Sequence, residues 1–519
     1  MLPFSAGLFL GLAIIAQAQQ FTNPVVYEDF SDNDVFLGPD GKTFYLSSST
    51  FHYSPGAPIL QSTDLVNWQI IGHSVPTLDF GSNYYMENNQ TAYNGGIWAS
   101  TLRHRKSNDQ WYWIGCVNFW TTYVYTAPDV TGPWKQSASF QPCFYDCGLL
   151  IDDDDTMYVA YGGGNVSVAQ LAADGLSIIQ TRPVFSTPPE CTGIEGNRMY
   201  KINGLYYVLG DCPAQGITLI WKSSNPFGPY ERKILSNNTP SPIPGTGSAD
   251  QGSLIETPNG QWYFMSFAWA YPLGRLPILA PVTWGSDGFP ILTTVNGAWN
   301  ESYPYPLPQN SSGSAWIGGD PFWGIGPAWE WNHNPDTTKF SLDSPGLTLQ
   351  TATVTNDLTH ARNTLTHRPN GQFPVGTLLL DFTNMADGDK CGLALLKDQS
   401  AWIGVVRSGN SYTITAVQGL IQDPNNNWAT TSTGTIVGTV PISVGQIHLQ
   451  VSMDARADGS KQAKFSYSSD GNSYTQLGGA FTLDTDYAYF AGYRFAIFNF
   501  ATKALGGSIK VLSFVSWTF

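Results

Sequence analysis

Charged side chains are scarce in this sequence: Asp, Glu, Lys and Arg together make up 12% of its 519 residues. Basic residues are the scarcer kind, with 24 Lys and Arg against 39 Asp and Glu, and the formal net charge is −15. Because an acidic surface repels phosphate backbones, nucleic acid is not expected as a partner. After residue 18 no stretch is long and apolar enough to cross a bilayer, so we expect a soluble mature chain with no membrane partner.

Motifs of several enzyme classes are also missing. There is no GxSxG nucleophile elbow and no phosphate-binding loop. The histidines are scattered and none lies at ligand spacing from a cysteine, so neither a cofactor nor a catalytic metal is expected. In an oxidising compartment some of the six cysteines are expected to pair, with several connectivities open. We expect Cys391 to be unpaired, because it lies far downstream of Cys116, Cys143, Cys147, Cys191 and Cys212.

The N-terminus has the pattern of a secretion signal. Residues 8–16 form a short apolar run, and Ala16-Gln17-Ala18 is a small-x-small cleavage site. Residues 1–18 are therefore predicted to be a signal peptide, and the protein to be secreted. Five glycosylation sequons fit secretion and mark surface loops if they are used; they begin at Asn89, Asn165, Asn237, Asn300 and Asn310. About 500 residues remain, which predicts two domains.

A five-fold repeat predicts the architecture of the first domain. Aromatic residues reach 14% and Gly and Pro are plentiful, which favours an all-β protein. A turn, an apolar residue, a tyrosine and another apolar residue recur as GKTFYL, NDQWYW, DDTMYV, NGLYYV and NGQWYF, with tyrosines 46 to 67 residues apart. This spacing suits one four-stranded blade per repeat. We predict a five-bladed β-propeller over residues 19–310.

The remaining chain has a different pattern. A Pro-rich stretch at 303–308 and a Ser/Gly-rich segment beginning at Ser311 predict a linker. Beyond it, runs such as TLLLDF, AWIGVV and SYTITAV are separated by Asn and Gly turns. Alternating runs of this kind predict an antiparallel β-sandwich over residues 311–519.

Carboxylates occupy equivalent positions in several repeats. Counting back twelve or thirteen residues from a repeat tyrosine reaches the innermost strand of a blade, and finds Asp32, Asp146, Glu195 and Gln251, with Trp98 near the same place in the second blade. Three acids at one end of the axis repel one another, which a structural role explains poorly. Glycoside hydrolysis needs a pair of carboxylates, so we interpret this cluster as catalytic.

Four segments carry a resemblance to a known family. NPVVYEDFSDNDVF, FYDCGLLIDDDDTMYVAY, GIEGNRMYKINGLYYVL and YPLGR resemble the signature stretches of glycoside hydrolase family 43, in a match that runs over residues 23–308. The tail resembles the β-sandwich appended to many exo-acting members. The resemblance implies a five-bladed propeller and an inverting mechanism.

The resemblance also implies roles for individual residues. Asp32 matches the general base, Asp146 the carboxylate that tunes the pKa of the acid, and Glu195 the general acid. Arg275 matches an arginine that contacts substrate and acid, and Phe51 and Trp98 match pocket residues. Two positions depart from the family pattern: Asn33 follows the base where Pro is usual, and Gln251 replaces a histidine that often lies beside a bound ion. The second departure argues against a central calcium.

Neighbouring acids leave alternatives open on the residues alone. Asp29 and Asp34 flank Asp32, and strand alternation places Asp34 on the same face, so only the family pattern selects Asp32. The acidic run at 152–155 is interpreted as a solvated turn, because four acids in one tight turn cannot all face one ion.

These features predict a secreted, monomeric, exo-acting α-L-arabinofuranosidase that removes arabinose side chains from arabinoxylan. Tyr145 and the loop around Cys143 favour arabinose; a β-xylosidase is the alternative, because the two sugars present similar hydroxyl geometry. Retaining fructan-cleaving propellers carry an NDPNG-like signature that is absent here. A carbohydrate-binding propeller without catalysis is disfavoured by the three acids and Arg275, and the sandwich is expected either to bind carbohydrate or to complete the pocket.

Overall fold

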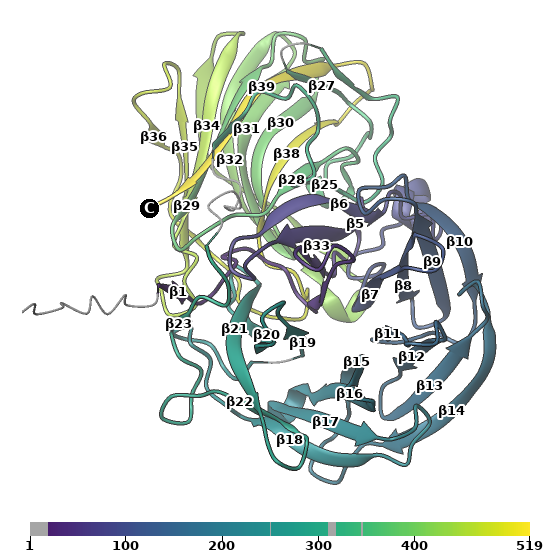
Figure 1. Ribbon diagram of the computed structural model, residues 1–519. Helices are drawn as coiled ribbons and strands as arrows, with labels where there is room; N and C mark the ends of the chain where they lie inside the picture. Colours follow the sequence, from purple (N-terminus) through teal and green to yellow (C-terminus); the bar gives the residue numbers. More distant parts are fainter. Residues whose placement is uncertain (1–18, 250, 310–317, 344–345) are drawn as a thin grey trace, which may run out of the picture.

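The computed structural model describes residues 19–249, 251–309, 318–343 and 346–519, and shows a β-propeller beside a β-sandwich (Figure 1). The predicted signal peptide, the sequon at Asn310 and the predicted linker from Ser311 lie outside the described residues. The last strand of the propeller part ends at residue 304 and the first of the sandwich begins at 318. Within the described residues, no helix is long and apolar enough to cross a membrane.

Five four-stranded antiparallel sheets form the propeller, each from one continuous piece of chain. The first two are β2 (Asp34–Leu37), β3 (Phe44–Ser47), β5 (Gly56–Ser62) and β6 (Gln69–Val75), then β7 (Ser100–Arg105), β8 (Gln110–Val117), β9 (Thr121–Ala127) and β10 (Lys135–Phe140). The third comprises β11 (Gly148–Ile151), β12 (Met157–Tyr161), β13 (Asn165–Leu171) and β14 (Ile178–Ser186). The last two are β15 (Glu195–Ile202), β16 (Leu205–Cys212), β17 (Ile217–Ser223) and β18 (Glu231–Asn237), then β19 (Ser253–Glu256), β20 (Trp262–Trp269), β21 (Arg275–Trp284) and β22 (Pro290–Leu292).

The repeat in the sequence corresponds to the blades. Each repeat tyrosine lies in the second strand of its blade, and the strand before it is the innermost one; the tyrosines are Tyr45, Tyr112, Tyr158, Tyr207 and Tyr263. The innermost strands pack side by side around the axis, and β19 of the last blade contacts β2 of the first. A short pair, β1 (Gln20–Thr22) with β23 (Ser302–Pro304), joins the two ends of this part of the chain. The five-bladed prediction is confirmed.

Two antiparallel sheets form the sandwich, as predicted. One contains β24 (Gly318–Asp320), β26 (Phe340–Leu342), β27 (Leu347–Gln350), β29 (Pro374–Asp381), β34 (Gln446–Met453), β35 (Gln462–Ser468), β36 (Thr475–Gln476), β37 (Phe481–Thr482) and β39 (Ser508–Thr518). The other contains β25 (Trp329–Asn332), β28 (Leu365–His367), β30 (Asp389–Leu396), β31 (Gln399–Ser408), β32 (Ser411–Asp423), β33 (Ala429–Ile442) and β38 (Arg494–Ala501). The propeller strand β4 (Tyr53–Ser54) pairs with β25 at the edge of this second sheet.

The few helical turns are short 3-10 segments. They are η1 (Ser82–Tyr85), η2 (Glu87–Asn89), η3 (Pro213–Gln215), η4 (Leu358–His360) and η5 (Pro424–Asn426). None of them contributes a side chain that the sequence singled out for chemistry.

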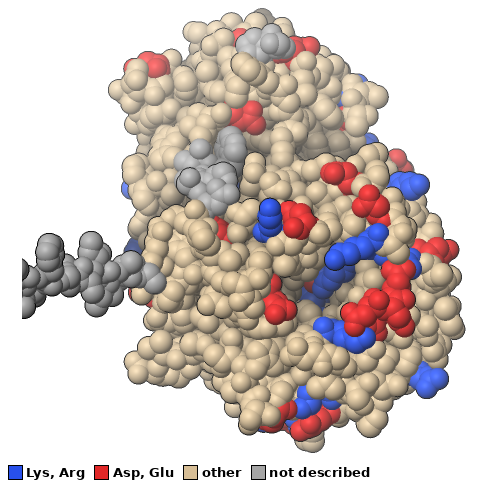
Figure 2. All heavy atoms as spheres, viewed as in Figure 1, with Lys and Arg blue, Asp and Glu red and all other residues tan. Residues whose placement is uncertain are grey.

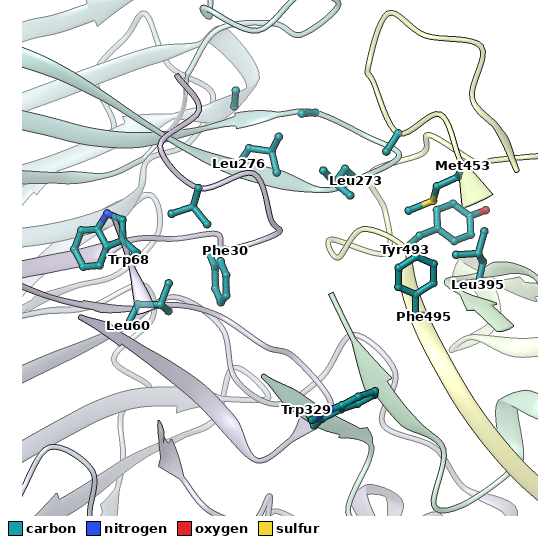
Figure 3. Close-up of a cluster of buried hydrophobic side chains, with 14 of the residues drawn as sticks. Phe30, Leu60, Trp68, Leu273, Leu276, Trp329, Leu395, Met453, Tyr493 and Phe495 are labelled. Carbon is teal, nitrogen blue, oxygen red and sulfur yellow. The ribbon is translucent and has the colours of Figure 1, made fainter. Parts of the chain in front are cut away.

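The hydrophobic core runs across the boundary between the two parts. One cluster of buried side chains includes Phe30 and Leu273 of the propeller together with Trp329, Met453 and Phe495 of the sandwich (Figure 3). Non-directional burial of this kind is the main favourable term in folding. The sandwich is therefore packed onto the propeller as part of one core.

A buried ionic cluster lies at the same boundary. The carboxylate of Glu330, which has no exposed surface, accepts hydrogen bonds from Arg368 and Arg494 and is 3.0 Å from the Nε2 of His73 in the propeller. Burial opposes ionisation of Glu330, but the two guanidinium groups outweigh it and hold the pKa of this carboxyl well below its usual value. The cluster fixes an ionised group between the two parts of the chain.

Some charged side chains of the propeller lie beside charges of opposite sign. On the face seen in Figure 2, most atoms are uncharged, and Lys and Arg lie next to Asp and Glu around the centre of the propeller. The acidic run 152–155 connects β11 to β12, as predicted, but its interpretation as solvated is wrong for Asp152, which is 7% exposed. Lys201 and the hydroxyl of Tyr206 both donate to Asp152, and these partners compensate for its removal from water.

Two disulfides join cysteines of the propeller, Cys116 to Cys143 and Cys191 to Cys212. Cys391 is buried and unpaired in the sandwich, which confirms the prediction for it. Cys147 is also free and buried, and its Sγ donates to the carbonyl of Ile114 at 3.4 Å.

Candidate active site

All the residues that the sequence selected line one small pocket at an end of the propeller axis. The cavity measures about 120 Å³. Its lining includes the predicted acids Asp32, Asp146 and Glu195 and the predicted binding residues Phe51, Trp98, Tyr145, Gln251 and Arg275. The repeat count therefore located the pocket.

The propeller geometry explains why these residues meet. Asp32, Trp98, Asp146 and Gln251 each lie two residues before an innermost strand, and Glu195 is the first residue of one. Asp32 and Asp146 have φ of 57° and 47°, in the left-handed region that non-glycine residues adopt infrequently. Backbone strain of this kind collects at functional sites. Each blade thus places one side chain near the axis, at or just before the start of its innermost strand.

The carboxylate of Asp32 is held by three donors. Its Oδ1 accepts from the Nε2 of Gln251 at 2.6 Å and from a terminal nitrogen of Arg275 at 2.8 Å, and its Oδ2 accepts from the hydroxyl of Ser49. Asp32 itself is 5% exposed. Three donors, one of them a cation, therefore fix the position of this carboxylate.

The other two acids lie together across the pocket. The backbone N–H of Gly196 donates to Asp146 Oδ2 at 3.0 Å, and the hydroxyl of Tyr145 donates to Glu195 Oε2 at 2.9 Å. Burial raises the pKa of Asp146 well above its usual value, and the negative charges of Glu195 and Asp32 raise it further. At least one carboxyl of this cluster, that of Asp146, therefore stays protonated to a higher pH than a carboxyl in water.

The flanking acids have other partners and do not line the pocket. Asp34 pairs with Arg103 at 2.7 Å and lies 3.5 Å from the Nε of Arg198. Burial opposes its ionisation, but Arg103 and Arg198 outweigh that effect and lower the pKa of Asp34. Arg198 also donates to the backbone carbonyl of Asp32 at 2.8 Å, which places the pair directly behind the pocket wall. Asp29 accepts from two backbone amides and is described below.

Several lining residues were not predicted. They are Ala99, Phe119, Asp211, Phe267, Trp269 and Phe490. The guanidinium of Arg275 lies within 5.1–5.8 Å of the ring centres of Phe51, Phe267, Trp269 and Phe490, a spacing suited to cation–π attraction. Alternation along WYFMSFAW leads to Phe267 and Trp269, since both precede Arg275 on the same hairpin. Phe490 belongs to the sandwich, and no local pattern signals it.

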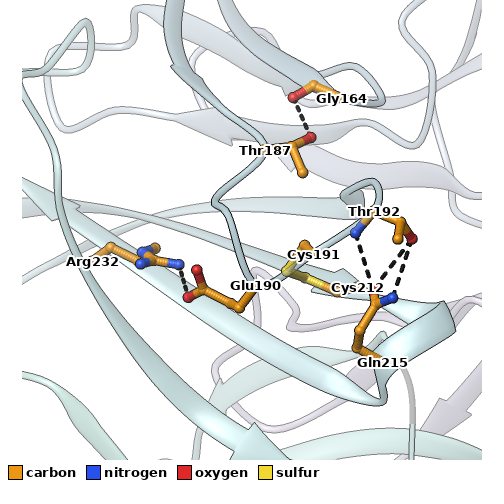
Figure 4. The surroundings of a disulfide bond; sticks show 8 residues. All are labelled: Gly164, Thr187, Glu190, Cys191, Thr192, Cys212, Gln215 and Arg232. Carbon is orange, nitrogen blue, oxygen red and sulfur yellow. Dashed lines mark hydrogen bonds and ion pairs between the residues drawn. A yellow bond between two sulfur atoms is a disulfide. The ribbon is translucent and has the colours of Figure 1, made fainter.

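A larger groove of about 630 Å³ adjoins the pocket on the Glu195 side. Phe119, Tyr145 and Glu195 line both spaces. The rest of the groove is lined by Tyr161 and Asn165 at strand ends, by Pro213 and Ala214 of η3, and by loop residues: Cys143, Gly162, Gly163, Gly164, Thr192, Gly193 and Ile194. Both disulfides tie these loops, one through Cys143 and the other through Cys191 and Cys212, next to Thr192 and Pro213 in the chain. Figure 4 shows the second disulfide with Thr192. Gln215 accepts from Thr192 in the same region.

At the position where the resemblance implied a histidine beside an ion, the amide nitrogen of Gln251 is committed to Asp32. Across the part of the chain that the structure describes, no group of three or more His, Cys, Asp or Glu side chains is arranged to hold a metal.

A five-bladed propeller with three carboxylates in one pocket offers the pair of carboxyl groups that a glycoside hydrolase requires. The family model for glycosyl hydrolases family 43 matches residues 21–290, and that for the β-xylosidase C-terminal concanavalin A-like domain matches residues 322–514. The chain belongs to glycosyl hydrolases family 43, which confirms the predicted family and enzyme class.

Individual relatives carry two kinds of name. The chain is 27% identical to a β-xylosidase of Formosa agariphila over 95% of this chain and 89% of that protein. It is 26% identical to a non-reducing end α-L-arabinofuranosidase of Bacteroides ovatus over 76% of each. A solved family 43 hydrolase superposes with a TM-score of 0.93 and 43% identity, covering 96% of this chain and 100% of the other. Engineering of that enzyme's active site gave both endo-xylanase and exo-arabinofuranosidase activity.

Proposed function

We propose that this protein is a secreted, inverting, exo-acting α-L-arabinofuranosidase that removes arabinose side chains from arabinoxylan. The observation that carries the proposal is the pair of connected spaces of very different size. The pocket, at about 120 Å³, is far smaller than the roughly 300–1,000 Å³ of sites for drug-sized ligands. It suits one terminal sugar. The groove beyond Glu195 is about 630 Å³ and suits the polymer that the sugar leaves.

The contacts support a division of roles between the acids. Asp32 is the general base: Gln251 and Arg275 donate to its Oδ1 and hold it in place, and it removes a proton from the attacking water. Glu195 is the general acid, because it lies where pocket and groove meet and the leaving oxygen passes from one to the other. The hydroxyl of Tyr145 donates to the Oε2 of Glu195 and orients this carboxyl.

Asp146 is proposed to tune the acid. It lies in the same pocket, and its own pKa is raised by burial and by the neighbouring carboxylates. Carboxyls that interact this strongly lose their protons in steps that belong to the cluster rather than to one residue. A buried partner that resists ionisation helps the cluster retain the proton that glycosidic cleavage consumes.

Arabinose is favoured over xylose by the walls on the Glu195 side. Tyr145 lines both spaces and Cys143 lines the groove, so the two features that suggested a side-chain-cleaving enzyme are in contact with substrate in this proposal. The alternative is a β-xylosidase, which the name of the Formosa agariphila relative supports.

We expect the enzyme to release arabinose from wheat arabinoxylan, and the first product seen by ¹H NMR to be the β-anomer, because inversion reverses the α-configuration. Sugar analysis of the same reaction identifies the product. Release of xylose from xylo-oligosaccharides with no arabinose would support the β-xylosidase instead. Binding of arabinoxylan without any product would indicate a carbohydrate-binding propeller.

Glu195→Gln is expected to lower kcat on arabinoxylan by about 10²–10⁴-fold, since the amide keeps the shape but donates no proton to the leaving oxygen. The loss should be much smaller for an aryl arabinofuranoside whose leaving group needs little protonation. Steady-state rates on both substrates, with the exposed Glu301→Gln as the matched control, make the comparison. Equal losses on the two substrates would remove Glu195 from the acid role.

Asp32→Asn is expected to abolish turnover on both substrates, because the water must be deprotonated whatever the leaving group is. The loss should be at least the roughly 10²–10⁴-fold typical of a general base. The assay is then repeated with sodium azide. Recovery of activity with an azide product of retained configuration would contradict the inverting assignment, because retention needs two successive displacements and therefore a nucleophile other than Asp32.

Asp146→Asn is expected to move the basic limb of the pH–rate profile to lower pH. Removing one negative charge from the cluster makes ionisation of the remaining acid easier, so the protonated form is lost earlier as pH rises. Because the pKa of Asp146 is raised in the folded state, its ionisation also costs stability as pH increases above its usual value of 3.8. The Tm of the variant should therefore exceed that of the wild type by a margin that grows from pH 4 to pH 7. A basic limb shifted upward would place Asp146 away from the acid.

A further inference from the structure

One buried carboxylate outside the pocket joins the sandwich to the active site. Asp29 is 8% exposed and lies three residues before Asp32. Its Oδ1 accepts the backbone N–H of Arg275 at 2.8 Å, and its Oδ2 accepts the backbone N–H of Gly492 at 2.9 Å. The first amide belongs to the propeller and the second to the sandwich, so a single side chain holds both.

Each of the two amides belongs to a pocket residue or lies close to one along the chain. Arg275 reaches Asp32 through its guanidinium, so the position of its backbone sets the position of that hydrogen bond. Gly492 is two residues after Phe490, whose ring lies 5.8 Å from that of Phe51 in a stacked arrangement on the pocket wall. Phe490 has a φ of 61°, and a bulky residue in the left-handed region needs support from its surroundings.

The backbone segments around Asp29 pack too closely to admit another side chain. A Cβ built on Gly274, which has a φ of 118°, would lie 2.4 Å from Asp29 Cγ. A Cβ built on Gly492 would lie 1.8 Å from the carbonyl oxygen of Leu273. Glycine is therefore required at both positions, and the close approach of the two chains is what brings both amides to one carboxylate.

The chemistry of the side chain also matters. An ionised carboxylate accepts at both oxygens, whereas an amide of the same shape accepts at one atom and donates at the other. Only the carboxylate satisfies two N–H donors at once. The guanidinium of Arg368 further donates to the backbone carbonyl of Asp29 at 2.9 Å, which ties the segment to the ionic cluster around Glu330.

We infer that Asp29 is a positioning residue that sets Arg275 and Phe490 in place together, so that the sandwich takes part in aligning the active site. The inference rests on the function proposed above for Asp32 and Arg275. Asp29 touches neither substrate nor reacting atoms. It acts through the two backbone amides that it holds.

Asp29→Asn tests this inference. The substituted amide leaves one N–H without an acceptor, so we expect the hydrogen bond from Arg275 to Asp32 to weaken. A misplacement of about 1 Å can cost 10²-fold in rate, and we expect kcat/KM on arabinoxylan to fall by about 10- to 100-fold. With a weaker cationic donor at Asp32, the acidic limb of the pH–rate profile should move to higher pH. Loss of a purely structural contact would not move that limb.

Asp152→Asn is the matched control. Asp152 is 7% exposed and also has charged and hydroxyl partners, but it lies in the turn after β11 and outside the pocket. We expect this variant to lose stability in thermal denaturation and to keep the acidic limb of the wild type. The same shift in both variants would overturn the inference, because it would report general loosening.

Amide hydrogen exchange gives a readout that does not depend on activity. In Asp29→Asn, exchange at the amides of Gly492 or Arg275 should speed up relative to the wild type, and these amides should be unaffected in Asp152→Asn. If the wild type fails to release arabinose, the proposed function fails, while the exchange rates still test the positioning. Faster exchange together with an unchanged pH profile and unchanged kcat/KM would overturn the inference.

A second variant covers the case in which Asp29→Asn does not fold. The hydroxyl of Tyr271 donates to the carbonyl of Phe490 at 2.7 Å. Tyr271→Phe removes this hydrogen bond to Phe490 and leaves the hydrogen bonds of Asp29 in place. We expect KM for arabinoxylan to rise several-fold while the acidic limb stays in place, because the amide of Arg275 keeps its acceptor. A wild-type KM in this variant would overturn the part of the inference that concerns Phe490.

Discussion

The structure of the site depends on holding three carboxylates close together against their mutual repulsion. Asp32, Asp146 and Glu195 lie in one small, largely buried pocket, where charges interact more strongly than in water. Arg275 and Gln251 donate to Asp32, whereas burial and the neighbouring carboxylates raise the pKa of Asp146. The acids therefore differ in their surroundings: a cation contacts Asp32, and Asp146 resists ionisation. A pair of carboxyls with pKa values pushed apart is what acid–base catalysis requires.

The sequence predicted the part of this arrangement that the repeat governs. Equivalent positions of successive blades face the axis, so a count from the repeat tyrosines reached Asp146, Glu195 and Gln251 without any knowledge of distances. The sequence pattern did not predict the burial of a side chain where that burial depends on partners from other strands. The run 152–155 was predicted to be solvated, yet Lys201 and Tyr206 bury Asp152.

Contacts between distant parts of the chain had no signal in the sequence. Asp29 and Gly492 are 463 positions apart, and their hydrogen bond depends on how the sandwich seats on the propeller. The same holds for Phe490, which completes a pocket built otherwise by the propeller, and for the pairing of Cys143 with Cys116 rather than with Cys147. The first two features depend on the shared core and the Glu330 cluster, and the disulfide depends on the approach of β8 to the loop after β10 within the propeller. Alternation within one segment encodes neither.

Pocket and groove are stabilised by different means, and this separates the chemistry from the choice of polymer. The acids lie at the starts of innermost strands, whose backbone groups are paired within the blades. Most of the groove is loop, and loops have fewer such pairings; there the disulfides close segments of 27 and 21 positions and reduce the freedom of the unfolded chain instead. Phe119, with a φ of 56° and 64% of its surface exposed, lies where the two spaces meet. Changes in the groove loops can therefore alter which polymer is accommodated while the hydrogen bonds around Asp32 stay as they are.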